Sequence, residues 1–400
     1  MNNMSNKAAV IRLHENSVFS KVAALISEIA TRATEIEKNC AVPMDLLEKV
    51  EATGAFRMAL SAHYGGGQMS VSEVCEVIEK IAAVDASVAW HLMIAIGSQY
   101  FTARLPRETL DTYYAAGPDT WSKGALAPKG LAVPVEGGYR LSGRWPLASG
   151  AREFKWVSVG FFIRDENGLR KGADGKQPDF RIGLVSHEHV KVIPTWDAVG
   201  LRGTRSDDLE MHDVFIAEDR QGPLWGPSNI DAPLYRIRLP VATDSYHGAV
   251  LIGAVKAALV ELATNSLDRK PAFNPAVLMR DEPVFKSRFG ELAVRFDALE
   301  ALYRQCIATL DMCAAQERDV TEQEAAKLGA ANALLHHECP RIMDEIIDLS
   351  GSGSIYMTNI QQRRWRDVRC VAQHQSGNIS LYAAYAESLV DTSLQQSQVG

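Results

Sequence analysis

The spacing of apolar residues divides the chain into a helical part, a strand-rich part and a second helical part. Residues 17–60 carry apolar side chains three and four positions apart, with charged residues between them, which predicts helices. The same spacing returns in residues 71–116. The stretch from Ile81 to Ile96 within them is apolar almost all round, so we expect a helix that is buried on every side.

From about residue 120 the pattern changes to short alternating runs separated by Gly and Pro, which predicts strands joined by turns. Gly137 and Gly138, between two such runs, predict a hairpin because glycine accepts a positive φ. The strand pattern continues to about residue 216, and the helical pattern resumes near residue 237. The four long helix candidates that follow are 241–268, 283–316, 321–348 and 361–391.

Four amphipathic helices with short connections predict a four-helix bundle. We therefore predict an α+β chain of three domains. These are an N-terminal helical domain over residues 1–118, a β domain (barrel or sandwich) over residues 119–235, and a C-terminal four-helix bundle over residues 236–400.

Composition narrows the class of protein. The net charge of −7 argues against nucleic acid or an anionic membrane as the main partner. The six cysteines form no CxxC pair, which is typical of reduced thiols in a cytoplasmic protein. The first residues lack a basic start followed by an apolar core, so we expect no signal peptide. No apolar run reaches the ~18 residues of a transmembrane helix, so we expect no membrane span.

Histidine and cysteine positions give no zinc spacing, and we predict no metal. His187 and His189 are two residues apart and would share one face of a strand. His336, His337 and Cys339 cluster elsewhere, but neither group supplies a full ligand set, and HExxH is absent.

The stretch from Leu349 to Gly377 combines a Ser/Gly run with a run of charged residues. If residues 361–374 are helical, four side chains share one face, because their spacings are four, three and four. Asp367 would then pair with an arginine while His374 points into a cavity. The four residues are Arg363, Asp367, Cys370 and His374.

Three motifs in order resemble the acyl-CoA dehydrogenase superfamily: GRWPLASGA (143–151), WDAVGLRGTRSDDLEMHDVFI (196–216) and SGSGSIY…RRWRD (350–367). In that superfamily a glycine-rich turn touches the flavin of a neighbouring subunit, and an Arg–Asp pair precedes a catalytic glutamate. Here His374 and Gln375 hold the matching positions. The chain therefore resembles the branch of two-component flavin monooxygenases, where a histidine occupies this place.

The resemblance implies cofactor-binding residues. Ser149 matches a serine near flavin N5, although a serine in a tight turn needs no such role. Trp196 would pack near the flavin ring, or equally fill the core between domains. The other residues expected to bind the cofactor or shape its site are Arg202, Thr204, Ser206, Gly351, Gly353, Arg363 and Asp367. Salt bridging to Asp367 is the structural alternative for the arginines around it.

The resemblance also implies the chemistry. Reduced flavin (FADH2 or FMNH2) would react with O2 to give a C4a-hydroperoxyflavin. His374, with His91, would orient or deprotonate an aromatic substrate of the indole or phenol type; the alternative for His91 is a satisfied core histidine. Ser149 would slow loss of peroxide. The expected substrate-binding residues are Trp90, His91, Tyr246 and Gln375.

Partners follow from the same comparison. The chain has no GxGxxG fingerprint for a dinucleotide, so a separate NAD(P)H:flavin reductase would supply the reduced flavin. A site shared across a subunit boundary implies a homotetramer. Two other functions stay open: an FAD-dependent acyl-CoA dehydrogenase with Asp244 as its base or with no conventional base, and a non-catalytic scaffold on the same fold.

Overall fold

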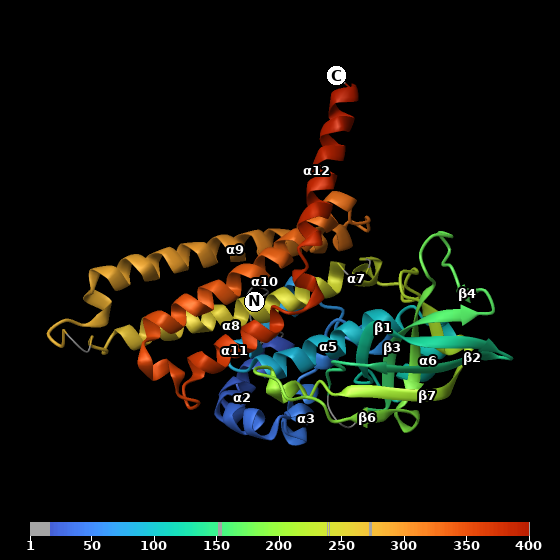
Figure 1. Cartoon of the computed structure of the whole chain (residues 1–400), viewed down its shortest axis with the longest axis horizontal. Helices are drawn as coiled ribbons and strands as arrows, with labels where there is room; N and C mark the ends of the chain where they lie inside the picture. The colour runs from blue at the N-terminus through green and yellow to red at the C-terminus, as the bar shows by residue number, and fades with distance from the viewer. Residues whose placement is uncertain (1–16, 151–153, 238, 240, 272–273, 400) are drawn as a thin grey trace, which may run out of the picture.

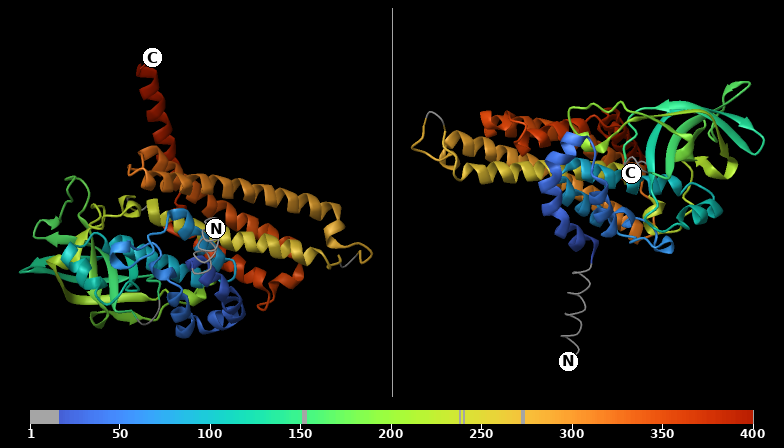
Figure 2. Two further views of the ribbon diagram at one scale, coloured as in Figure 1. Left: turned by 180° about the vertical axis from the view of Figure 1, so that it is seen from behind. Right: turned by 90° about the horizontal axis from the view of Figure 1, so that it is seen from below.

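The computed structural model describes residues 17–150, 154–237, 239, 241–271 and 274–399. Ala151 of the first motif and the N-terminal segment tested for a signal peptide lie outside these residues. A β-sheet occupies one end of the molecule and long helices the other, with the N-terminal helices packed along both (Figure 1). The two further views in Figure 2 show the same division. The predicted α+β fold is confirmed.

The N-terminal helices are α2 (Val18–Asn39), α3 (Met44–Ala52), α4 (Val71–Ala82), α5 (Ala86–Thr102) and α6 (Arg107–Tyr114). The helical stretch predicted over residues 71–116 is thus three helices. Asp85 starts α5 because its carboxylate accepts the amide of Val88, a typical N-cap. Pro106 precedes α6 and cannot continue the helix before it. Within α5 only Ile94 is not buried, as the apolar stretch predicted.

The middle part forms one eight-stranded sheet in the order β6–β7–β2–β1–β3–β5–β8, with β4 paired to β3. The first four strands along the chain are β1 (Ser122–Val135), β2 (Gly138–Trp145), β3 (Trp156–Asp165) and β4 (Gly168–Leu169). The last four are β5 (Phe180–Ser186), β6 (Lys191–Ile193), β7 (Asp208–Ala217) and β8 (Gln221–Pro223). The predicted hairpin joins β1 and β2, and Gly137 has a φ of 76°. His187–His189 form a 3-10 turn and not the predicted strand.

The C-terminal part contains α7 (Pro233–Arg236), α8 (Val241–Ser266), α9 (Pro283–Ala315), α10 (Glu322–Ser350), α11 (Ile360–Val371) and α12 (Ser380–Val399). Helices α8, α9, α10 and α11 lie side by side, and α12 projects away from them (Figure 1). The prediction of a single helix over residues 361–391 is therefore wrong. The chain leaves α11 at Ala372, makes a 3-10 turn at Gln375–Gly377, and starts again at Ser380.

The break in this helix has a local cause. His374 caps the short turn, because its Nδ1 accepts the amide of Ser376. Gly377 lies so close to His336 of α10 that a β-carbon would sit 2.7 Å from the histidine Cβ. The shared helical face predicted for Arg363, Asp367 and His374 thus ends before His374, which lies on the turn instead.

The centre of the molecule is the packing of α8 against α4, α5 and α10, and it belongs to one large apolar core. By length and composition α8 alone, among the described helices, would pass as a membrane span, yet 67% of its most apolar window is buried inside the fold. A helix apolar on all sides is equally typical of a protein core. The sheet has its own smaller core, with Trp145 fully buried and bonded to Gly160.

Candidate active site

Two turns at the edge of the sheet carry unusual backbone. One follows β2 and includes Leu147 (φ 59°); the other precedes β7 and includes Leu201 (φ 50°) and Arg205 (φ 45°). Positive φ costs free energy in residues other than glycine, and such strain gathers at functional sites. The two turns are joined by backbone hydrogen bonds, one of them from the amide of Ala148 to the carbonyl of Asp207 at 3.0 Å.

A row of buried hydroxyl groups connects these turns to α5. The indole Nε1 of Trp90 donates to Ser149 Oγ at 3.0 Å, and Ser149 Oγ lies 2.6 Å from Ser206 Oγ. Ser206 Oγ lies 2.7 Å from Thr204 Oγ1, which donates to the carbonyl of Leu201 at 2.8 Å. The structure thus brings together Ser149, Thr204 and Ser206, which the sequence singled out in two separate motifs.

These turns match the chemistry of a flavin ring. Such a ring has apolar faces and an edge of nitrogen and oxygen atoms that needs hydrogen-bond partners. The two turns combine the buried, mutually bonded hydroxyls of Ser149, Thr204 and Ser206 with apolar side chains that are open to solvent, since Leu147 is 65% and Val199 is 60% exposed. Polar groups beside apolar surface are the usual lining of a cofactor site. The residues present therefore fit a flavin.

His374 also lies next to Trp90. Its ring centre is 5.9 Å from that of Trp90 and 3.8 Å from that of His247 on α8, with which it is stacked. Nδ1 of His374 lies 2.9 Å from Ser376 Oγ, and this hydroxyl donates to Asp244 Oδ1 at 2.7 Å. A carboxylate is therefore linked to the imidazole through one hydroxyl group.

Burial decides the charge of these groups. It lowers the pKa of His374 to about 3, with the nearby His336 lowering it further, so the imidazole is neutral at pH 7. Burial also lowers the pKa of His247 well below its usual value, with His374 and His336 as further causes. Burial raises the pKa of Asp244 to about 6, while the hydrogen bond from Ser376 lowers it. At neutral pH the site thus holds neutral histidines and one carboxylate.

His91 and Arg202 contact the second turn and not the cluster around His374. The ring of His91 is buried, with Nε2 3.1 Å from the carbonyl of Gly203. Arg202 donates to the carbonyl of Ala198 at 2.9 Å and lies 3.1 Å from the sulfur of Cys40. Both side chains hold the turn in place, which is the structural role that we weighed for them. Their proposed contacts with substrate or cofactor stay predictions.

Trp196 also fastens this turn. Its Nε1 lies 3.2 Å from the carbonyls of both Leu201 and Arg202, and its ring packs against the helical core. Gly200 is required there, because a β-carbon would lie 2.4 Å from the carbonyl of Arg366 on α11. The second turn is therefore held between the sheet and α11, and a flavin contact of Trp196 stays a prediction.

The expected ion pair between Asp367 and an arginine does not form in the structure. Asp367 accepts the amide of Leu201 at 2.6 Å, whereas Arg366 pairs with Glu37 of α2. Arg363 donates to the carbonyl of Val84 at 3.3 Å. Burial, followed by the nearby Asp85, raises the pKa of Asp367 to about 7. These residues attach α11 to the turn and to the N-terminal helices.

The remaining predicted residues lie apart from the cluster. Gly351 ends α10 with a φ of 68°, and a β-carbon there would lie 2.0 Å from Arg269, so this close approach is to a side chain of the same chain. Gly353 has open space around it. Tyr246 is fully buried with its hydroxyl 3.0 Å from that of Tyr100, and Gln375 is exposed. Gln375 directly follows His374 in the chain, and the roles of Tyr246 and Gln375 in substrate binding stay predictions.

Sequence reasoning missed His247 and Ser376, and considered Asp244 only as a dehydrogenase base. Asp244 and His247 are three residues apart on α8, a spacing that places both on one face, so this pair had a detectable signal. Ser376 had none, because its role depends on the turn that ends α11. Among the described residues, no group of three or more His, Cys, Asp or Glu side chains could hold a metal ion.

Two family models match the helical parts of the chain. The model described as "Acyl-CoA dehydrogenase, N-terminal domain" matches residues 18–105, and "Acyl-CoA dehydrogenase, C-terminal domain" matches residues 245–378. The chain belongs to the acyl-CoA dehydrogenase superfamily. The C-terminal match covers Asp244's neighbours on α8 as well as α11, His374 and Ser376.

Curated relatives assign this superfamily member to a branch. An indole-3-acetate monooxygenase from Acinetobacter baumannii is 27% identical over 93% of this chain and 94% of its own length. The oxygenase component of an FADH2-dependent resorcinol hydroxylase from Rhizobium sp. is 26% identical over 94% and 95%. The oxygenase subunit HsaA of a flavin-dependent monooxygenase from Rhodococcus jostii is 24% identical over 90% and 94%. The predicted branch of two-component flavin monooxygenases is confirmed.

Solved structures show the same fold. XiaF from Streptomyces sp., in complex with FADH2 and glycerol, has a TM-score of 0.88 at 23% identity and covers 97% of this chain and 98% of its own. TdsC from Paenibacillus sp., in a complex with FMN and indole, has a TM-score of 0.79 at 19% identity over 94% and 97%. At these identities the likeness concerns the fold, with its helical domains on either side of a sheet domain.

Proposed function

We propose that this protein is the oxygenase component of a two-component monooxygenase that hydroxylates a small aromatic or heteroaromatic substrate. The observation that carries the proposal is that Trp90 contacts both the row of hydroxyl groups and His374. Nε1 of Trp90 bonds Ser149 of the hydroxyl row, and the indole ring contacts His374. The relatives support the enzyme class, because they include oxygenase components that act on indole-3-acetate and resorcinol by their names.

A reduced flavin, when bound at the two turns, supplies the activation of O2. The residues of this chain hold it, exclude water and manage a proton. The hydroxyls of Ser149 and Ser206 are bonded to each other at the turns, and Trp90 contacts both Ser149 and His374. A dry site favours transfer of oxygen to substrate over release of hydrogen peroxide.

His374 is the proposed base. Nε2 of His374 accepts a proton from a phenol or an indole only when Nδ1 carries the ring hydrogen, so in the proposal Nδ1–H donates to the Ser376 hydroxyl and gives up the hydrogen bond from the Ser376 amide. Asp244, through the Ser376 hydroxyl, then stabilises the imidazolium that forms. Ser376 and Asp244 are therefore positioning residues in the proposal.

The test is oxygen consumption coupled to a flavin reductase, with NADH and either FAD or FMN. Each member of a panel of phenols and indoles is added, and hydroxylated product and hydrogen peroxide are measured. We expect product formation that requires the reductase and that falls ~10²–10⁴-fold in His374→Ala. Product that forms without added reduced flavin, or at the same rate in His374→Ala, would contradict the proposal.

Asp244 favours a second candidate, an acyl-CoA dehydrogenase. It is a partly buried carboxylate that is linked to His374 through Ser376, and its pKa of about 6 suits a general base. One of its oxygens is already engaged by Ser376. An acyl-CoA that bleaches the yellow colour of the FAD-loaded protein without oxygen would support this candidate over hydroxylation.

Assembly into a homotetramer stays part of the proposal. The loop that follows Gly351 exposes three apolar side chains in sequence, namely Ile355, Tyr356 and Met357, each about two thirds or more exposed. Exposed apolar clusters of this kind are typical of protein interfaces. Location in the cytoplasm also stays a prediction, which the six free cysteines support.

A further inference from the structure

Arg104, two residues after α5, is a buried cation without an acidic partner. Arg104 is only 5% exposed. Nη1 donates to the carbonyl of Tyr100 at 2.6 Å, and Nε has no hydrogen-bond partner. Among the described residues no carboxylate lies within ion-pair distance of it, unlike the half-exposed Arg304, which pairs with Glu79 and Glu300.

Such an arrangement is costly in a folded protein. A guanidinium has five N–H donors, and a buried charge is normally paired. Burial lowers the pKa of Arg104 to about 10, so the side chain still carries its charge at neutral pH. The carbonyl of Tyr100 satisfies only one donor. The geometry therefore leaves most of this fork available to an anion.

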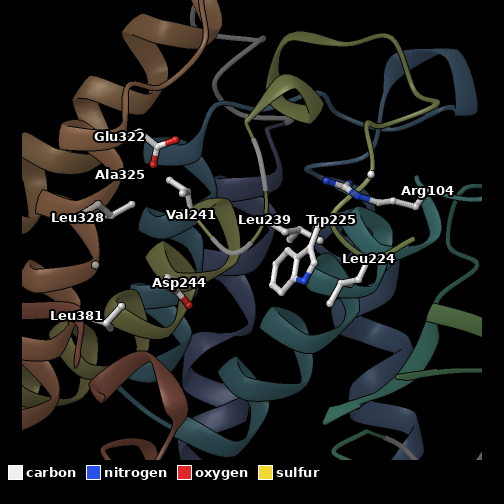
Figure 3. Close-up of a pocket in the computed structure, with 12 residues that line it drawn as sticks. Arg104, Leu224, Trp225, Leu239, Val241, Asp244, Glu322, Ala325, Leu328 and Leu381 are labelled. Atoms are coloured by element: carbon white, nitrogen blue, oxygen red, sulfur yellow. The ribbon is translucent and has the colours of Figure 1, made fainter. Parts of the chain in front are cut away.

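Arg104 forms one wall of a cavity of about 370 Å³. The volume is within the range of small-molecule sites, which is ~300–1,000 Å³. The lining is mostly apolar and includes Leu224, Trp225, Leu239, Leu328 and Leu381. In Figure 3 the guanidinium points into this space, and the indole of Trp225 lies between Arg104 and Asp244. A flat apolar ring fits such a lining.

The opposite side of the cavity carries the acidic groups. Asp244 and Glu322 lie across the pocket from Arg104 (Figure 3). Asp244 accepts from Ser376 through Oδ1, and its Oδ2 has no hydrogen bond to another described residue. The cavity is therefore cationic at one end and acidic at the other, which excludes an anionic group from the Asp244 end.

We propose that this cavity binds a small aromatic carboxylate whose carboxylate pairs with Arg104 and whose ring end is directed to Asp244. The proposal deepens the proposed function, on which it rests, by naming the substrate class. Asp244 lines the cavity and is bonded to Ser376, which contacts His374, so the Asp244 end of the cavity is separated from the proposed base by one hydroxyl group. Two opposite anchors also define the orientation of the ring.

Binding can be measured without flavin or turnover. Indole-3-acetate and its neutral counterpart indole-3-acetamide are titrated into the full-length protein by calorimetry. We expect the acid to bind about tenfold or more tightly than the amide, because a bidentate pair with a buried arginine is a strong contact. Equal affinities, or no binding of either compound, would overturn the proposal.

Variants then assign the preference to Arg104. Arg104→Gln removes the charge but keeps a donor for the carbonyl of Tyr100, and should weaken binding of the acid by about 10- to 100-fold with the amide changed by less than about threefold. Arg104→Lys should restore part of the preference. Arg107→Gln, at an exposed arginine three residues further on, is the matched control and should bind like the wild type.

The outcomes separate this inference from the proposed function. If the acid binds through Arg104 but is not hydroxylated, the proposed monooxygenase function is wrong and the proposed ligand class is supported. If neutral phenols are hydroxylated and acids are not preferred, the monooxygenase function is supported and the proposed ligand class is wrong. If Arg104→Gln and Arg107→Gln bind indole-3-acetate equally, Arg104 is only a structural residue and the proposal is wrong. Should Arg104→Gln fail to fold, the comparison of acid with amide and the Arg104→Lys variant decide.

Discussion

Ser376→Ala is the sharpest test of the path from Asp244 to His374. The change removes one hydroxyl, which bonds Asp244 at 2.7 Å and His374 at 2.9 Å. It leaves the amide of Ser376, which also contacts His374, so the ring keeps one of its contacts. Ser376 does not line the cavity next to Arg104, so substrate affinity should change little.

The size of the effect follows from the geometry. Two hydrogen bonds of this length limit the separation of Asp244 and His374 to about 6 Å. At an effective dielectric constant of about 20, one charge at that distance stabilises an imidazolium by about 3 kcal/mol, or about a hundredfold in rate. Part of this interaction survives without the hydroxyl. We therefore expect hydroxylation by Ser376→Ala to fall by about 10- to 100-fold.

The assay is a single turnover with reduced flavin, substrate and oxygen, in which product and peroxide are both measured. Oxygen should be consumed at near the normal rate, with peroxide replacing product. The rate of the wild type should rise with pH as Asp244 ionises around its pKa of about 6, and this dependence should weaken in Ser376→Ala. Ser376→Thr, which keeps the hydroxyl, and Ser380→Ala, at an exposed position, are the controls. A hydroxylation rate within about twofold of the wild type, with an unchanged pH profile, would refute the role of Ser376.

Other predictions test the rest of the site. Ser149→Ala should release more peroxide and lower the free energy of unfolding by about 2–3 kcal/mol, because it orphans the buried N–H of Trp90; chemical denaturation and peroxide assays check both, and unchanged values would remove Ser149 from the site. His374→Gln should flatten the pH dependence of the free energy of unfolding. The pKa of His374 is about 3 in the folded protein, below its unfolded value, so the contribution of His374 to stability is complete above about pH 6.5 and is lost as the pH falls towards 3. Denaturation at several pH values measures this dependence. A slope equal to that of the wild type would show that His374 is not buried as described. Tyr356→Asp should weaken the proposed tetramer in sedimentation, and a wild-type protein that is already monomeric would contradict the proposed assembly.

The sequence by itself determined the elements that rest on local rules. The apolar stretch from Ile81 to Ile96 predicted a buried helix, and α5 is buried because a helix without a polar face has no side to present to water. The alternation after residue 120 predicted the sheet for a similar reason, since successive side chains of a strand point to opposite faces. Three motifs were sufficient to indicate the superfamily and its flavin monooxygenase branch.

The tertiary structure decided which residues meet. Periodicity extended the last helix past His374, but Gly377 packs on His336 and Ser376 bonds Asp244, and these contacts with α8 and α10 end the helix at Ala372. No local pattern contains such contacts, because they join residues that are far apart in the sequence, 132 positions in the case of Ser376 and Asp244. The sequence around Arg104 likewise gives no sign of its environment, because an arginine after a helix is usually exposed. Only the folded chain shows that it is buried, that no carboxylate of the described residues pairs with it, and that it faces a cavity.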